Sequence, residues 1–183
     1  MIDAESPTTA FRTKPAPVDP SLQHEIEQFY YFSMTAASKN GSICWPKIFI
    51  TSCQSEPTRI MREAEQEYSG AHEYAHFDDN AQMMRGRLRK ITSDVSWSEN
   101  PASRTRHVIS NVMIVDGDNP GEYHVSNVFI VYRNRLERQL DIFAGERKDI
   151  LRRTGSEAGF ELAKRTILID QSTILANNLS FFF

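Results

Sequence analysis

Residues 104–132 read RTRHVISNVMIVDGDNPGEYHVSNVFIVY, and this stretch decides the fold class. On both sides of 116–121 (Asp-Gly-Asp-Asn-Pro-Gly) the side chains follow a period of two, which is typical of β-strands. Glycines in the connection supply the positive φ angles of a tight turn, so we predict a long antiparallel hairpin. In the first strand we expect one face to carry Val108, Ser110, Val112 and Ile114, and the other Ile109, Asn111, Met113 and Val115. The return strand, 123–132, places Val125, Asn127, Phe129 and Val131 on one side.

Two further strands follow the hairpin. Alternation of Leu136, Arg138, Leu140 and Ile142 predicts a third strand, in which Gly145 marks a bulge or a bend. A turn at 155–159 then leads into a fourth strand at 160–169.

Two helices are predicted before the strands. Asp19-Pro20 predicts the start of a helix, because an aspartate side chain can cap the helix N-terminus and proline suits the first helical position. Leu22, Ile26, Phe29 and Tyr30 then fall on one helical face. We expect Asp78 or Asp79 to cap a second helix with apolar Met84, Leu88 and Ile91 and a solvated basic face of Arg85, Arg89 and Lys90. Helices followed by hairpins predict an α+β domain with a curved antiparallel sheet.

The two ends of the chain differ in character. Residues 1–18 hold three prolines and no apolar period, so we predict an extended arm before a single domain at 19–183. Phe181, Phe182 and Phe183 close the chain, which suggests a tail docked on the core or on another subunit. Association with another subunit is the simpler explanation.

Composition excludes several classes of protein. The chain has 183 residues and a formal net charge of −3, which argues against a dedicated nucleic-acid binder. No apolar run approaches the roughly 20 residues of a membrane helix, and we expect a cytoplasmic protein. Cys44 and Cys53 form neither a disulfide framework nor a four-thiolate metal site, and neither has the spacing to histidine of an iron–sulfur ligand set.

One short motif has metal chemistry. Residues 72–76, His-Glu-Tyr-Ala-His, match the H-E-x-x-H zinc pattern, in which His72 and His76 would bind zinc and Glu73 would act as base. The residues around this motif do not show the apolar spacing of a helix, which the zinc pattern requires. The alternative is two loop histidines near a capping aspartate.

Arginines gather near the predicted strand ends. They are Arg104, Arg106, Arg133, Arg135 and Arg138, and they form either an anion pocket or salt bridges across strands or subunits with Glu137, Asp141 and Glu146. We interpret them, with Phe181, Phe182 and Phe183, as candidate subunit-interface residues. His107 and His124 lie within strand patterns and are interpreted as buried, hydrogen-bonded histidines rather than catalytic bases.

Longer blocks of sequence are more specific than these motifs. They include 25–31 (EIEQFYY), 103–112 (SRTRHVISNV), 132–139 (YRNRLERQ), 141–147 (DIFAGER), 164–168 (KRTIL) and 177–183 (NNLSFFF). Over residues 19–31 and 59–183 the chain resembles the small (β) subunits of aromatic ring-hydroxylating dioxygenases, with the biphenyl and cumene branch nearest.

This resemblance implies a fold like nuclear transport factor 2 (cystatin-like), with helices packed on one side of a strongly bent sheet. It also implies a hexamer of three large (α) and three small (β) subunits. The α subunit would hold a Rieske 2Fe–2S cluster and a mononuclear Fe(II), receive electrons from NADH through a reductase and a ferredoxin, and dihydroxylate the ring. The small subunit would be structural, without catalytic, cofactor-binding or metal residues. The alternative from the residues alone is a stand-alone lyase or isomerase with a pocket in the sheet.

Residues 32–58, FSMTAASKNGSICWPKIFITSCQSEPT, depart from the resemblance. The family has there a charged amphipathic helix leading into a strand. A shifted reading frame from the third base of the Phe32 codon permits such a sequence. We therefore hypothesise a local frameshift, with a few residues also lost after Tyr31.

Overall fold

The computed structural model describes part of the chain. The described residues are 18–38, 54–55, 59–60, 79–91, 102–136, 138–171, 173–179 and 181–183. The predicted arm lies outside them except for Val18, as do most of segment 32–58 and the whole 72–76 motif. Neither described helix is both long enough and apolar enough to cross a membrane.

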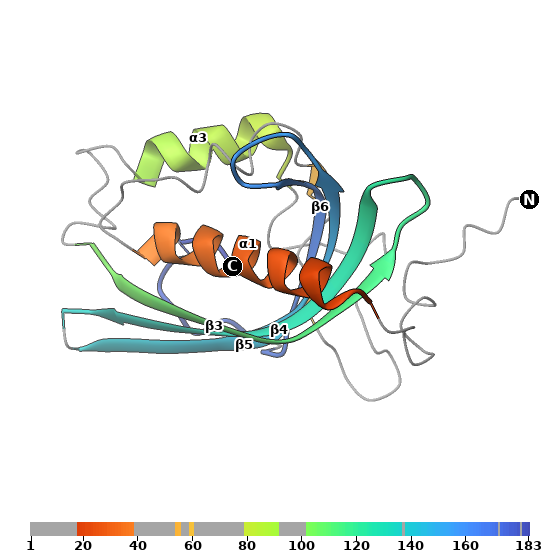
Figure 1. Cartoon of the computed structure of the whole chain (residues 1–183). Helices are drawn as coiled ribbons and strands as arrows, with labels where there is room; N and C mark the ends of the chain where they lie inside the picture. The colour runs from red at the N-terminus through yellow and green to blue at the C-terminus, as the bar shows by residue number, and fades with distance from the viewer. Residues whose placement is uncertain are drawn as a thin grey trace, which may run out of the picture.

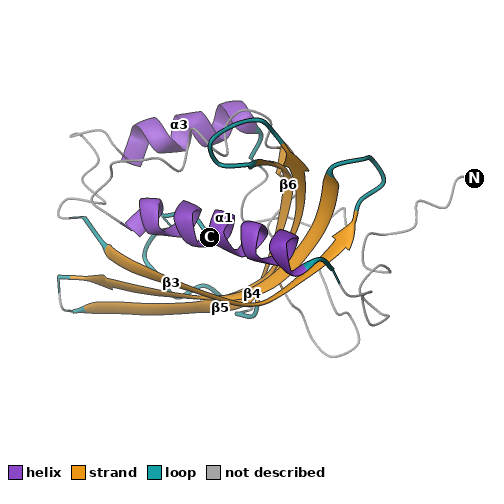
Figure 2. Cartoon of the chain, in the orientation of Figure 1, coloured by secondary structure: helices purple, strands orange, loops and turns teal. Residues whose placement is uncertain are grey.

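Two helices and six strands make up the described fold (Figure 2). They are α1 (Pro20–Ser38), β1 (Gln54–Ser55), β2 (Arg59–Ile60), α3 (Ala81–Ile91), β3 (Arg104–Asp116), β4 (Glu122–Arg135), β5 (Gln139–Arg153) and β6 (Phe160–Ile169).

The four long strands form the predicted antiparallel sheet. Its order is β3-β4-β5-β6, and the two-residue strands β1 and β2 add in parallel beyond β6. The sheet bends strongly around α1, and α3 lies beyond α1 (Figure 1). The α+β class with helices on one side of a curved sheet is therefore confirmed.

Strand bounds follow the predicted pattern with two corrections, of which the first is that β4 continues to Arg135, beyond the predicted end at Tyr132. β6 coincides with the predicted strand at 160–169, and Gly159 opens it with a φ of 74°. The third strand was predicted from Leu136, but β5 begins at Gln139. Leu136 has a φ of 53°, so it is a turn residue between β4 and β5 rather than part of a strand.

A β-bulge interrupts β3 at Asn111, whose φ is 53°. Ser110 pairs with Val128 and Met113 with Ser126, so two residues of β3 oppose one residue of β4. The two faces of the strand exchange at this point. Val108 and Ile114, predicted on one face, lie on opposite faces, with exposed fractions of 58% and 2%. The predicted unbroken alternation is wrong, because a bulge shifts the period by one residue.

The start of α1 is the predicted one. The backbone N–H of Ser21 donates to Asp19 Oδ1 at 3.3 Å, and the Ser21 hydroxyl donates to Asp19 Oδ2 at 2.6 Å. These hydrogen bonds favour the carboxylate and lower the pKa of Asp19.

The cap of α3 differs from the prediction by one or two residues. Asn80, not Asp78 or Asp79, accepts hydrogen bonds from the backbone N–H groups of Gln82 and Met83, each at 3.0 Å. Asp79, which precedes α3, instead forms an ion pair with Arg87 of that helix. The predicted basic face, Arg85, Arg89 and Lys90, is exposed.

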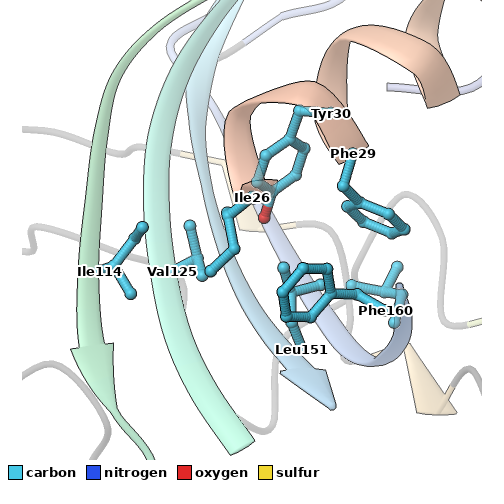
Figure 3. Packing of buried hydrophobic residues seen from close by; sticks show 8 residues of the cluster. Ile26, Phe29, Tyr30, Ile114, Val125, Leu151 and Phe160 are labelled. Carbon is cyan, nitrogen blue, oxygen red and sulfur yellow. The ribbon is translucent and has the colours of Figure 1, made fainter. Parts of the chain in front are cut away.

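Apolar burial occurs in two clusters on the concave side. The helix cluster lies between α1 and the sheet (Figure 3) and comprises Ile26, Phe29, Tyr30, Ile114, Val125, Leu151, Phe160 and Leu162. The tail cluster comprises Phe129, Val131, Phe143, Ile169, Phe181 and Phe183. The two clusters together fill the hollow of the sheet with α1 and the C-terminal tail.

Gly145 sits where β5 and β6 approach closely. A Cβ atom at this position would lie 2.0 Å from the carbonyl oxygen of Leu168. The register shift of β5 is between Ile150 and Leu151, so Gly145 marks a close backbone approach rather than a bulge.

Candidate subunit interface and the interior of the sheet

A buried ion pair joins β5, β6 and α1 on the concave side. Arg165 donates two hydrogen bonds to Asp149, from Nε to Oδ1 at 2.8 Å and from Nη2 to Oδ2 at 2.6 Å. The Tyr30 hydroxyl donates to the same Oδ2 at 2.7 Å. Asp149 and Arg165 are cross-strand partners, so the pairing of β5 with β6 aligns them. A bidentate pair with a third donor gives the carboxylate nearly full hydrogen bonding without water.

Burial fixes the protonation of this cluster. The pKa of Tyr30 is raised well above 10 by its burial and by the nearby negative charge of Asp149. The phenol therefore stays protonated and donates to Asp149. Burial, with the positive charge of Arg165, lowers the pKa of Arg147 to about 9, so its guanidinium remains charged at neutral pH and lies 4.9 Å from the Phe129 ring centre.

His107 is held by the C-terminal tail. Its Nε2 lies 3.1 Å from the carbonyl oxygen of Phe182, so the neutral ring donates there. Burial lowers the pKa of His107 to about 4, and Nδ1 is buried without a hydrogen-bond partner. The imidazole is neutral at pH 7 and a weak base. This supports the prediction of a structural histidine over a catalytic one.

The predicted arginines separate into two groups. Arg133 is 1% exposed and points inward, where Nη1 donates to the Asn178 carbonyl at 3.0 Å and Nη2 donates to Asn178 Oδ1 at 2.8 Å. Its Nε donates to Ser103 Oγ at 3.0 Å, and Asp141 lies 3.4 Å from Nη1. Arg133 therefore clamps the tail of its own chain. Arg104, Arg106 and Arg138 are exposed, and Arg135 is half-buried.

The closing phenylalanines pack on their own chain. Phe181 and Phe183 are buried, with ring centres 4.8 Å apart, and Phe143 contacts both. Phe182 is half-buried under Arg87, whose Cζ lies 5.0 Å from the ring centre. Of the two docking sites expected for the tail, the structure shows the core of the same chain. It accounts for these apolar residues without a second subunit.

The convex side of the sheet carries a surface that sequence reasoning did not single out. We call it the outer-face patch, and its members are Val108, Val128, Ile130, Tyr132, Leu140 and Ile142, each between 37% and 59% exposed. Cross-strand pairing places Val108 opposite Ile130, and Tyr132 opposite Ile142. The signal in the sequence was the apolar character of both faces of β4, where Val128, Ile130 and Tyr132 alternate with buried residues.

One group of metal-ligating side chains lies at the β3–β4 turn. Asp118, Glu122 and His124 each offer a ligand atom within 4.8 Å of the others. The Glu122 carboxylate is already paired with Arg152, whose Nε is 3.0 Å from Oε2. A cation would therefore compete with a guanidinium for one of its three ligands. The predicted zinc residues His72, Glu73 and His76 lie outside the described residues.

One helix and the C-terminal tail pack against the concave face of the curved sheet. This arrangement is the nuclear transport factor 2 (cystatin-like) type of α+β fold. A chain of naphthalene 1,2-dioxygenase has this fold with a TM-score of 0.74 and 21% identity, over 94% of this chain and 89% of that one. The β subunit of benzoate 1,2-dioxygenase from Burkholderia mallei has a TM-score of 0.61 and 14% identity, over 85% and 93%.

Sequence comparison defines the family within this fold. The family described as "Ring hydroxylating beta subunit" matches residues 48–176. Over the full length of both chains, 81% of positions are identical to biphenyl 2,3-dioxygenase subunit beta of Rhodococcus jostii (strain RHA1). Benzene 1,2-dioxygenase subunit beta of Pseudomonas putida is 64% identical, again over both full lengths. The chain belongs to the ring-hydroxylating dioxygenase β subunits, which are part of an oxidoreductase complex.

Proposed function

We propose that this chain is the structural small subunit of a terminal oxygenase that cis-dihydroxylates biphenyl-type aromatic hydrocarbons. The observation that carries the proposal is full-length identity of 81% to a biphenyl 2,3-dioxygenase subunit beta. The benzene 1,2-dioxygenase relative at 64% supports the same substrate class, unfused aromatic rings.

In this proposal the chemistry belongs to a large α subunit. The α subunit carries the Rieske 2Fe–2S cluster and the mononuclear Fe(II), and it receives electrons from NADH through a reductase and a ferredoxin. Three α and three β subunits form the complex, in the cytoplasm. The residues of this chain do not fit the cluster, because its two cysteines, Cys44 and Cys53, have no histidine near them in the sequence.

The buried polar side chains on the concave side of the sheet support a structural role for this chain. Asp149 is fully engaged by Arg165 and Tyr30, and His107 is tied to the tail. A stand-alone lyase or isomerase needs an acid or base that can exchange protons with a substrate. These groups instead join α1 and the tail to the sheet.

Purification of the untagged complex from its host tests the proposal. We expect a native mass for three large and three small chains, with iron that follows the large chain. The isolated small chain should have no dihydroxylation or lyase activity. A metal-free species that contains this chain alone at physiological concentration would contradict the proposal.

A further inference from the structure

The outer-face patch is unusual for a surface in water. One face of an antiparallel sheet packs on the core, and the other is normally polar where solvent covers it. Here β4, the middle strand of the patch, presents Val128, Ile130 and Tyr132 outward in succession. Flanking strands extend the same apolar surface, with Val108 on β3 and Ile142 on β5. Contiguous exposed apolar surface of this kind marks an interaction site.

Arginines border the patch on one side. Arg106 is opposite Tyr132 on the outer face, and Arg104 is opposite Asn134, which pairs in turn with Leu140. Arg138 is exposed in the turn between β4 and β5. Within the described part of the chain, these three arginines form no ion pair. An apolar centre with a charged rim has the anatomy of a protein interface.

The charge of this rim selects the kind of partner. Three exposed arginines at one edge favour a partner that brings carboxylates to that edge. A different chain with an apolar surface and carboxylates around it would match both features. Neither of the two described helices covers this side of the sheet, because α1 and α3 both lie on the concave side (Figure 1).

We propose that the outer-face patch, with Arg104, Arg106 and Arg138 at its rim, is the surface that docks the large subunit. This inference rests on the proposed function, because it takes the large subunit as the partner. The partner surface it requires is apolar at its centre and acidic where it meets the arginines. The C-terminal phenylalanines and Arg133 are not part of this surface, since they are committed to the interior.

The test is assembly of the co-expressed complex with Ile130→Thr/Ile142→Thr. Threonine keeps the β-branched shape and suits a strand, while its hydroxyl makes the patch polar. Met83→Thr is the matched control, because Met83 is 51% exposed against 49% for Ile130 and lies on α3, away from the sheet. We expect the double variant to lower the co-purified large subunit at least tenfold. The control should assemble like the wild type.

A charge variant tests the rim without changing the apolar centre. Arg106→Glu should weaken assembly, and the difference from wild type should shrink at high salt. Thermal unfolding of the isolated variants checks that each chain is folded. If the double variant and the Arg106→Glu variant are both folded and both assemble with the large subunit like the wild type, the inference is wrong. It is also wrong if the variants lose only the association of small chains with one another and still bind the large subunit. If wild-type chain fails to bind the large subunit, the proposed function itself fails.

Discussion

At the scale of single residues, Asp149 shows how the interior of this subunit is held together. The carboxylate accepts hydrogen bonds from Arg165 and Tyr30, which belong to β6 and α1. Arg165 also donates to the main-chain oxygen of Phe183 at 3.2 Å. One acidic side chain therefore connects the sheet, the helix and the tail, and its removal should loosen all three.

Asp149→Asn should destabilise the fold by about 3–5 kcal/mol, because it leaves a buried guanidinium without its counter-charge. Chemical unfolding of the isolated chain, followed by circular dichroism, measures the change. Glu157→Gln is the control, since Glu157 is exposed in the turn before β6. Equal stabilities for the two variants would show that the ion pair contributes little.

His107 should make stability depend on pH. Its folded pKa of about 4 lies below the ordinary value of 6.5, so falling pH protonates the unfolded chain first. The contribution of His107 to the free energy of unfolding is therefore fully present above pH 7, and it is lost as the pH falls from 6.5 towards 4. Between pH 7.5 and 5 the loss is about 2 kcal/mol.

The variant His107→Gln isolates this effect, because glutamine can still donate to Phe182 but does not titrate. Urea unfolding at several pH values should show a steeper loss of stability for wild type than for the variant below pH 6.5. Parallel curves for the two proteins would mean that His107 is not protected from protonation.

At the scale of elements, the pairing of β5 with β6 depends on a missing side chain. A Cβ at Gly145 would collide with the backbone of Leu168, and a backbone contact cannot rotate away. Gly145→Ala should cost more than about 3 kcal/mol. Gly86→Ala on α3 is the opposite case, because nothing lies within 4 Å of its Cβ position. It should stabilise the chain by about 0.5–1 kcal/mol.

Thermal unfolding of both glycine variants makes the comparison. We expect a lower melting temperature for Gly145→Ala and a slightly higher one for Gly86→Ala. If the two alanines shift the melting temperature in the same direction, the close approach of β5 and β6 does not control this part of the sheet.

The elements themselves could largely be predicted from local sequence. The start of α1 was predicted from a capping pair, and β6 was predicted as the strand that follows the turn at 155–159. The bulge at Asn111 could not be predicted, because alternation continues in the letters of the sequence while the backbone shifts by one residue. The inward direction of Arg133 also depends on a distant residue, Asn178, which is 45 positions away. Local patterns carry no information on such contacts.

At the scale of the whole molecule, the hypothesis of a frameshift in residues 32–58 can be compared with the length and identity of the relatives. Its alignment with the Rhodococcus relative spans 187 positions for 183 residues, so at least four positions have no residue here. At 81% identity, about 36 of the 187 positions are not identical. The segment has 27 residues, and with the four missing positions it would account for 31 of them. These counts are compatible with the hypothesis of a local frameshift with lost residues, and the family match at 48–176 includes residues 48–58 of the segment.

Peptide mass spectrometry tests whether the natural protein contains this segment. Trypsin cuts after lysine and arginine, so the written sequence predicts peptides 40–47 and 48–59. If the frameshift lies only in the written sequence, neither peptide will appear, while peptides from β4 to β6 will be abundant. Detection of both would place the Ser/Thr-rich segment in the protein. A folded subunit would then carry polar residues where the family resemblance implies an amphipathic helix, and we would expect weaker packing and weaker assembly.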